Sequence, residues 1–328
     1  MRTTRLGLAL VVWGGIAAGS GAASAQQPYP ARPITIVVPA AAGGPTDAVA
    51  RMIGESMGRS LSQQVVIENV GGAAGTIAMA RVAKSPADGY TLAVWHIAQA
   101  IAPALYDNLR YNVIDDFDSI GRITDVPMTI VGKANLEPKT AADLIAWIKQ
   151  KHEAVTYAHA GIGSAAHLCS LLFMDALRVK MTAVSYRGTG PAMTDLLGGV
   201  FDLMCDQTTT TTNQIKEGRI KGYAATTKVR LSVLPDLPTL DEAGLRGFEV
   251  TAWHAMWAPH GLPSEVIGKL NAALQAALKD PKVNERLAAL GTEPVPIELA
   301  TRDALNAHLT AEVAKWGPIL RAAGAKGE

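Results

Sequence analysis

Residues 34–61 read ITIVVPAAAGGPTDAVARMIGESMGRSL and carry the clearest secondary-structure pattern of the chain. The five β-branched residues at 34–38 predict a buried strand, because a short apolar run that ends in a turn signal is typical of a parallel sheet. Pro39 ends this run, and five small residues follow it. Apolar residues then recur at helical spacing, so a helix is expected to begin at Thr46.

The same order of strand, glycine-rich loop and helix recurs along the chain. Further strands are predicted at 65–67, 90–94, 155–158 and 183–186 among other short β-branched runs. Strands that alternate with helices in this way indicate an α/β protein with parallel sheets. The chain from Ser264 onward is predicted to be helical, with a last helix that is bent or broken at Gly317 and Pro318, because proline cannot continue the hydrogen-bond ladder of a helix.

Four loops between a strand and a helix consist largely of small residues: 40–46, 69–76, 161–164 and 188–191. The first N–H groups of a helix lack helical partners, and the helix dipole adds partial positive charge there. Small residues would let an anion approach this backbone closely. In open α/β sheets such loops lie where ligands bind. The alternative is that these glycines and serines only form tight turns and helix caps.

The patterns that indicate enzymes or cofactor sites are weak in this chain. No loop has the spacing of a dinucleotide or P-loop fingerprint. The residues GESMG at 54–58 match a nucleophile-elbow pattern but fall inside the first predicted helix. Ser164 and His167 could meet on one helical turn, yet no acidic residue is placed to orient the histidine. The seven histidines lack metal-ligand spacing, so we expect no enzyme activity, no metal and no cofactor.

Residues 1–25 have the pattern of a secretory signal peptide. Two arginines precede an apolar stretch that is too short to span a bilayer, and Ala23 to Ala25 offers a cleavage site. Cleavage would leave residues 26–328, which exceed a usual single core and favour two domains. Without the two arginines the 30 basic residues fall to 28 against 29 acidic ones, with no basic block. Nucleic acid is therefore not an expected partner.

The chain has two cysteines, Cys169 and Cys205. Export would allow a disulfide between them, whereas two buried free thiols fit the sequence equally well. A disulfide needs a particular distance between the two Cα atoms, which the sequence does not supply. Both alternatives therefore stay open at this point.

Seven long stretches carry a resemblance to a known family. They are YPARPITIVVPAAAGGPTDAVAR (29–51), VVIENVGGAAGTIAMARVAKSPADGYTL (65–92), YAHAGIGSAAHL (157–168), YRGTGPAMTDLLGG (186–199), FDLMCDQ (201–207), LPDLPTLDEAGLRGFE (234–249) and WAPHGLPSEVIGKLNAAL (257–274). In this order they resemble the Bug, or TctC-like, family of periplasmic solute receptors of tripartite tricarboxylate transporters. The resemblance covers nearly all of residues 26–328.

The resemblance implies a type II periplasmic-binding-protein fold, in which two α/β domains close on a ligand in the cleft between them. The first domain would consist of residues 26–125 and 223–328, and the second of residues 126–222. The implied function is capture of a small carboxylate, either a di- or tricarboxylate or an aromatic carboxylate, in the periplasm. The implied partners are that ligand and the membrane permease subunits of a tripartite transporter, with the receptor acting as a monomer.

The resemblance also implies which loops hold the ligand carboxylate. One side of the cleft would be the first loop and the second loop, and the other side would be formed by the loops of the second domain. The implied ligand-binding residues are Ala41, Ala42, Gly43, Gly44, Thr46, Asp47, Asn69, Gly72, Ala73, Gly75, His96, Gly161, Gly163, Ser164, His167, Tyr186, Arg187 and Asp206. His167 could instead be a helix residue that packs against its loop.

The chain also departs from the family pattern. Ala40 replaces a frequent aromatic residue, Val70 and Gly71 replace an arginine–proline pair, and the run 208–212 of five threonines replaces a more apolar stretch. Trp95 and His96 stand where small polar residues are common. The identity of the carboxylate is therefore not implied. Two alternative functions remain, a receptor that presents its ligand to a membrane sensor kinase and an enzyme that acts on carboxylates.

Overall fold

The computed structural model describes residues 28–322, so the predicted signal peptide lies outside the described residues. The strands are β1 (Ile34–Val38), β2 (Val65–Asn69), β3 (Thr91–His96), β4 (Phe117–Lys133), β5 (Thr156–His159), β6 (Thr182–Ser185), β7 (Leu203–Gln207), β8 (Ile220–Ala225) and β9 (Thr251–Pro259). The helices are α1 (Pro45–Leu61), α2 (Thr76–Ala83), α3 (Ala98–Leu105), α4 (Ala141–Lys151), α5 (Ala165–Leu177), α6 (Thr189–Leu197), α7 (Thr208–Lys216), α8 (Ser264–Lys279), α9 (Pro281–Ala289) and α10 (Arg302–Ala322).

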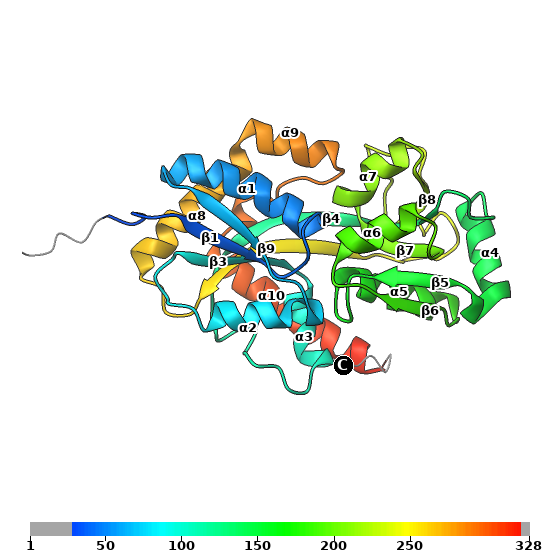
Figure 1. Ribbon diagram of the computed structural model, residues 1–328, viewed down its shortest axis with the longest axis horizontal. Coiled ribbons are helices and arrows are strands. Elements are labelled where there is room, and N and C mark those ends of the chain that lie inside the picture. Colours follow the sequence, from blue (N-terminus) through cyan, green and yellow to red (C-terminus); the bar gives the residue numbers. More distant parts are fainter. Residues whose placement is uncertain (1–27, 323–328) are drawn as a thin grey trace, which may run out of the picture.

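The strands form two parallel groups that two long strands join. Strands β2, β1 and β3 are parallel neighbours, and so are β6, β5 and β7. Strand β4 pairs with β9 through residues 117–127 and with β7 and β8 through residues 128–133. One strand thus passes from the first group to the second. We call the β1–β3 group with its helices the first lobe, and the β5–β8 group with its helices the second lobe (Figure 1).

Helices cover both faces of the sheet, as the α/β pattern predicts. In the first lobe α1, α8 and α9 lie on one face and α2, α3 and α10 on the other (Figure 1). The apolar stripe of α1, including Met52, Ile53 and Met57, is buried against the sheet. Burial of each such side chain contributes roughly 1.5–3 kcal/mol. The residues GESMG lie within α1, away from any strand-to-helix turn.

Several elements differ from the sequence-based expectation. Strand β9 and the first part of β4 were not predicted, because both are buried on both faces and show no alternation of apolar and polar residues. The last helix is not broken, since α10 continues through Pro318. Trp316 and Leu320 are buried on either side of this proline and hold the helix against the core. The predicted boundary between residues 222 and 223 falls inside β8, which pairs with β4 on both sides of this point.

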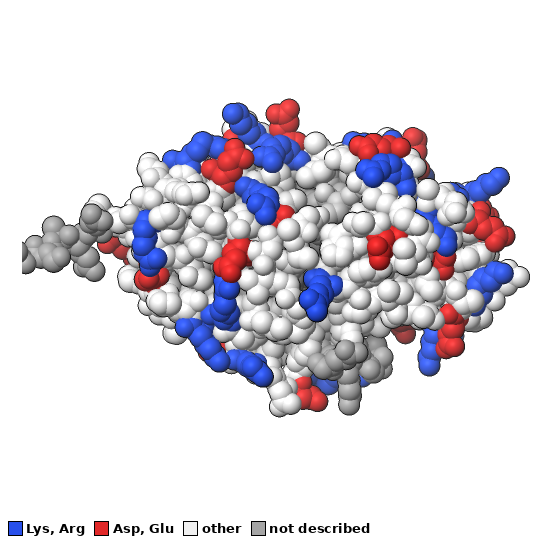
Figure 2. All heavy atoms as spheres, viewed as in Figure 1, with Lys and Arg blue, Asp and Glu red and all other residues white. Residues whose placement is uncertain are grey.

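Charged side chains of both signs are interspersed over the face shown in Figure 2, without a block of one sign. This distribution agrees with the formal net charge of +1 for the whole sequence. Within residues 28–322, no helix combines the length and the apolar character needed to cross a bilayer.

Candidate ligand-binding cleft

Loops from the two lobes meet where the parallel strands end. A Cβ atom on Gly188, before α6, would lie 2.9 Å from the Cβ of Ala41 in the loop after β1. A Cβ atom on Gly190 would lie 2.4 Å from the carbonyl oxygen of Ala42. Side chains at these glycines would keep the loops apart, so glycine permits the close approach of the two lobes.

A cavity of about 610 Å³ opens beside this contact. Its volume lies in the range of small-molecule sites. Tyr106 of the first lobe donates a hydrogen bond of 2.6 Å to the carbonyl oxygen of Ile162 in the second lobe, which links the two walls. The lining residues are Pro39, Gly71–Gly75, Ile77 and Tyr106 from the first lobe, and Ala160–Ile162 and Ser185–Arg187 from the second.

A carboxylate group holds the loop before α1 in place through hydrogen bonds. Asp47 accepts a hydrogen bond of 3.0 Å from the N–H of Gly43 and forms an ion pair with Arg51. Burial would raise the pKa of Asp47, but the hydrogen bonds from Arg51 and Gly43 hold it below its usual value. Asn69 adds a hydrogen bond from its amide to the carbonyl of Ala40. The Asp47 carboxylate is thus an ionised part of the loop, already engaged by protein donors.

The start of α1 offers hydrogen-bond donors. Gly44 is its N-cap, and no side chain caps this helix. The N–H groups of Thr46 and Asp47 therefore have no helical acceptor, and the helix dipole adds partial positive charge beside them. This is an arrangement suited to a carboxylate.

Two buried histidines lie next to this helix start. Thr46 Oγ1 lies 3.0 Å from His254 Nε2, and the ring of His254 lies 5.7 Å from that of His96. Burial lowers the pKa of His96 well below its ordinary value and that of His254 to about 3. Both rings are therefore neutral at physiological pH. His96 Nδ1 accepts a hydrogen bond from the N–H of Ala98, which places its proton on Nε2.

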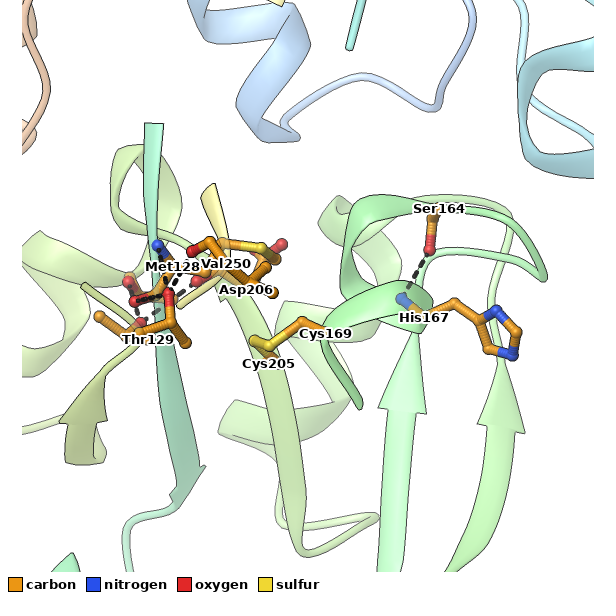
Figure 3. The surroundings of a disulfide bond; sticks show 10 residues. Met128, Thr129, Ser164, His167, Cys169, Cys205, Asp206 and Val250 are labelled. Carbon is orange, nitrogen blue, oxygen red and sulfur yellow. Dashed lines mark hydrogen bonds between the residues drawn. A yellow bond between two sulfur atoms is a disulfide. The ribbon is translucent and has the colours of Figure 1, made fainter. Parts of the chain in front are cut away.

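Two further histidines shape the loop before α5. The N–H of Gly161 donates to His159 Nδ1, and the N–H of Gly163 donates to His167 Nδ1, each at 3.2 Å. Ser164 is the N-cap of α5 and accepts from the N–H of His167 at 3.1 Å (Figure 3). Burial lowers the pKa of both histidines, that of His167 to about 3. These donors and acceptors thus hold the loop in its conformation.

The loop before α6 contributes one tyrosine and one cation. Tyr186 donates a hydrogen bond of 2.7 Å to Asp195, and burial together with this carboxylate raises the pKa of Tyr186 to about 12. Arg187 lines the cavity and is exposed, without an ion pair to any residue in 28–322. It can therefore attract an anion toward the mouth of the cleft.

Asp206 lies at the end of β7 and is buried, with only 1% of its surface exposed. It accepts hydrogen bonds from the hydroxyls of Thr189 and Thr210, and burial raises its pKa to about 6. The preceding residue, Cys205, forms a disulfide with Cys169 of α5, with 6.1 Å between the Cα atoms (Figure 3). The structure thus resolves the alternative that the sequence left open, in favour of the disulfide.

Comparison with known proteins identifies the family to which this chain belongs. Residues 49–325 match the model of the tripartite tricarboxylate transporter family receptor. The chain belongs to this receptor family. The fold is similar to that of the periplasmic binding protein BugD, with a TM-score of 0.89, 46% identity and coverage of 92% of this chain and 100% of BugD. The expected type II periplasmic-binding-protein fold and the expected family are confirmed.

Two further proteins of similar structure were solved with carboxylates bound. One is MatC from Rhodopseudomonas palustris with bound malate, with a TM-score of 0.86, 38% identity and coverage of 89% of this chain and 100% of MatC. The other is Rpa4515 from R. palustris with adipate, with a TM-score of 0.86, 33% identity and coverage of 91% of this chain and 99% of that protein. These two similar proteins thus bind small carboxylates.

In this member of the receptor family, the implied ligand residues fall into three sets. One lines the cavity: Gly72, Ala73, Gly75, Gly161, Tyr186 and Arg187. The second lies at the contact of the lobes or in the buried polar groups beside it: Ala41, Ala42, Gly44, Thr46, His96 and Asp206. The third braces loops through hydrogen bonds: Gly43, Asp47, Asn69, Gly163, Ser164 and His167.

Sequence reasoning did not identify several residues that the structure places beside these sets. His254 contacts Thr46, Thr189 contacts Asp206, and Ile77 and Tyr106 line the cavity. His254 lies in the unpredicted strand β9, so no loop pattern could indicate it. Tyr106 follows α3, which the sequence analysis also did not predict. Thr189 could have been found, because it stands in the glycine-rich loop 188–191.

Proposed function

We propose that this protein is a periplasmic solute receptor that captures a small carboxylate between its lobes and delivers it to the permease subunits of a tripartite tricarboxylate transporter. The observation that carries the proposal is the meeting of helix starts and glycine-rich loops from both lobes at one cleft. Family membership and the malate and adipate bound to similar receptors support it. In this proposal residues 1–25 direct the export of the chain, and the exported receptor acts as a monomer.

Backbone amides supply the main recognition of the carboxylate in this proposal. The unpaired N–H groups at the start of α1 donate to it, and Arg187 attracts it to the cleft. The side chains of Asp47, Ser164 and His167 contribute indirectly, because their hydrogen bonds hold the loops in place. A di- or tricarboxylate or an aromatic carboxylate would fit a cavity of about 610 Å³ that has both polar and apolar lining.

Closure of the lobes couples binding to delivery. The loop contacts of Gly188 and Gly190 exist only when the lobes are together. An anion that contacts both lobes stabilises this closed form, since it binds the closed form better than the open one. The chain crosses between the lobes twice, within β4 near residue 125 and between β8 and β9. These crossings separate residues 26–125 and the C-terminal part from the middle of the chain. The lobes would rotate about them.

A thermal-shift assay with a panel of mono-, di-, tri- and aromatic carboxylates tests this function. A ligand at a hundredfold excess over its dissociation constant stabilises the folded protein by about 2.7 kcal/mol, which raises the melting temperature. Sugars and metal cations serve as controls. A shift with sugars or cations, and none with any carboxylate, would contradict the proposal. Turnover of the bound acid would favour an enzyme instead.

A further inference from the structure

Ile77 is an exposed isoleucine in the wall of the cleft cavity. It lies in the first turn of α2, and 58% of its surface is exposed. A single apolar side chain on an open surface is common and needs no explanation. Of the large apolar residues exposed within residues 28–322, however, only Ile77 lines the cavity of about 610 Å³. Its uncovered surface is therefore available to a molecule in that cavity.

The start of α2 holds Ile77 in this position. A Cβ atom on Gly75, the N-cap of α2, would lie 2.6 Å from Cζ2 of Trp95, so the helix start is packed tightly on the core. The side of α2 that faces the core carries Met79 and Val82, which are both fully buried. Ile77 is thus excluded from the core and remains in the cavity wall.

The loop in front of α2 leaves the end of this side chain open. A Cβ atom on Gly72 would lie 3.2 Å from Cδ1 of Ile77, and no other atom would lie within 4 Å of it. Gly72 also lines the cavity. A larger residue at position 72 would crowd this methyl group, whereas glycine leaves room beside it for a ligand.

The only charged residue in the cavity wall is Arg187, which belongs to the second lobe. A Cβ atom on Gly71, which also lines the cavity, would lie 3.1 Å from the carbonyl oxygen of Arg187 and 3.2 Å from the backbone nitrogen of Ala41. The cavity therefore borders the loop that leads to α1. The charged end of a ligand in this cavity would lie toward this loop and Arg187.

The remaining side chains in the wall are largely apolar. Pro39 and Tyr106 of the first lobe and Ile162 of the second line the same cavity as Ile77. A carboxylate with an apolar body can keep its charged end near Arg187 while its body covers Ile77, and it would then contact both lobes. A small polar acid would leave the apolar surface of Ile77 in water.

We propose that Ile77 packs against an apolar part of the ligand, so that the receptor selects carboxylates with an alkyl chain or an aromatic ring over small polar acids. This inference rests on the proposed function and deepens it. It names the class of carboxylate and a residue that selects this class.

Isothermal titration calorimetry on the purified receptor tests the inference with pairs of acids that differ in their apolar part. The pairs are adipate and succinate, phenylacetate and acetate, and mandelate and glycolate. Ile77→Ser removes the apolar side chain, and Ile77→Leu keeps one of the same size. Val200→Ser is the matched control, because Val200 is 66% exposed between α6 and β7 and does not line the cavity.

We expect the wild type to bind the more apolar acid of at least one pair more tightly. Ile77→Ser should weaken that acid about five- to tenfold and leave its partner unchanged, since covering about half of an isoleucine corresponds to a change of this size. Ile77→Leu and Val200→Ser should both keep the preference of the wild type.

Two results would overturn the role of Ile77 while the carboxylate function stands. One is a wild type that prefers the more apolar acid in none of the pairs. The other is an Ile77→Ser variant that changes the affinity for both members of a pair equally, or for neither. A wild type that binds no acid of the panel would overturn both proposals.

Discussion

Gly190, in the first turn of α6, lies against the backbone of Ala42 in the opposite lobe: a Cβ atom on Gly190 would come within 2.4 Å of the Ala42 carbonyl oxygen. The backbone of Gly190 does not have a positive φ. An alanine is therefore compatible with the helix itself and conflicts only with the other lobe. This makes the position a direct probe of lobe closure.

We predict that Gly190→Ala weakens carboxylate binding. Overpacking costs about 1–3 kcal/mol, and here the cost falls on the closed form alone, so the affinity should fall roughly 5- to 150-fold. Calorimetry gives the affinity, and small-angle X-ray scattering with ligand should show a larger radius of gyration than for the wild type. Gly268→Ala is the control, because Gly268 lies in α8 with nothing within 4 Å of its Cβ position. Unchanged affinity in Gly190→Ala would mean that the lobes do not meet here in the bound state.

We predict that the disulfide stabilises the second lobe. Cys169 and Cys205 are 36 positions apart, and closing a loop of this length removes unfolded-state entropy worth about 4 kcal/mol. The double variant Cys169→Ala with Cys205→Ala should lose stability of this order in urea denaturation. Addition of a reductant should lower the stability of the wild type but not that of the variant. Equal denaturation midpoints for the two oxidised proteins would count against a stabilising disulfide.

The contribution of Asp206 to the free energy of unfolding should fall as the pH rises. Its pKa is about 6 in the folded protein because of burial, against an ordinary value of 3.8. The neutral carboxyl group therefore favours the folded state at low pH, and this contribution is lost as the pH rises from about 4 to 6. Each pKa unit corresponds to about 1.36 kcal/mol, so Asp206→Asn should gain up to about 3 kcal/mol on the wild type between pH 4 and pH 7. A difference that is constant with pH would show that Asp206 is already ionised at pH 4.

The buried histidines should make the free energy of unfolding rise with pH, which is opposite to the effect of Asp206. His167 and His254 have pKa values of about 3 in the folded protein, because burial disfavours their charged form, whereas an unfolded histidine has a pKa near 6.5. Stability is therefore present above pH 6.5 and lost as the pH falls toward 3. His254→Gln should make the free energy of unfolding less dependent on pH in this range. An unchanged pH dependence would mean that His254 is charged in the folded protein.

The sequence predicts the glycine-rich loops of the cleft well, but it does not predict strand β9 and the first part of β4, which join the lobes. The strand 34–38 and the helix after it have strong periodic patterns, and the structure has both. Strand β9 escapes prediction because burial on both faces hides any alternation of apolar and polar residues. Helix α3 escapes prediction because it has only eight residues and Pro103 inside it argues against a helix. These missed elements carry or precede His254 and Tyr106, so part of the cleft could not be predicted.

The roles of individual site residues depend on contacts that only the folded chain creates. Nothing local to Gly163 indicates that its N–H donates to a histidine four positions later, and a loop pattern alone presents it as a ligand donor. The threonine run 208–212 likewise gives no sequence signal that four hydroxyls pair and one does not. That distinction depends on where Leu290 and Gly291 lie in space.

A crystal structure with the carboxylate that gives the largest thermal shift tests the central claim most directly. The account predicts that the carboxylate group lies at the start of α1, within hydrogen-bond distance of the N–H groups of Thr46 or Asp47, and that the ligand also contacts residues of the second lobe. A ligand bound to one lobe only, or at a site away from these loops, would contradict the account.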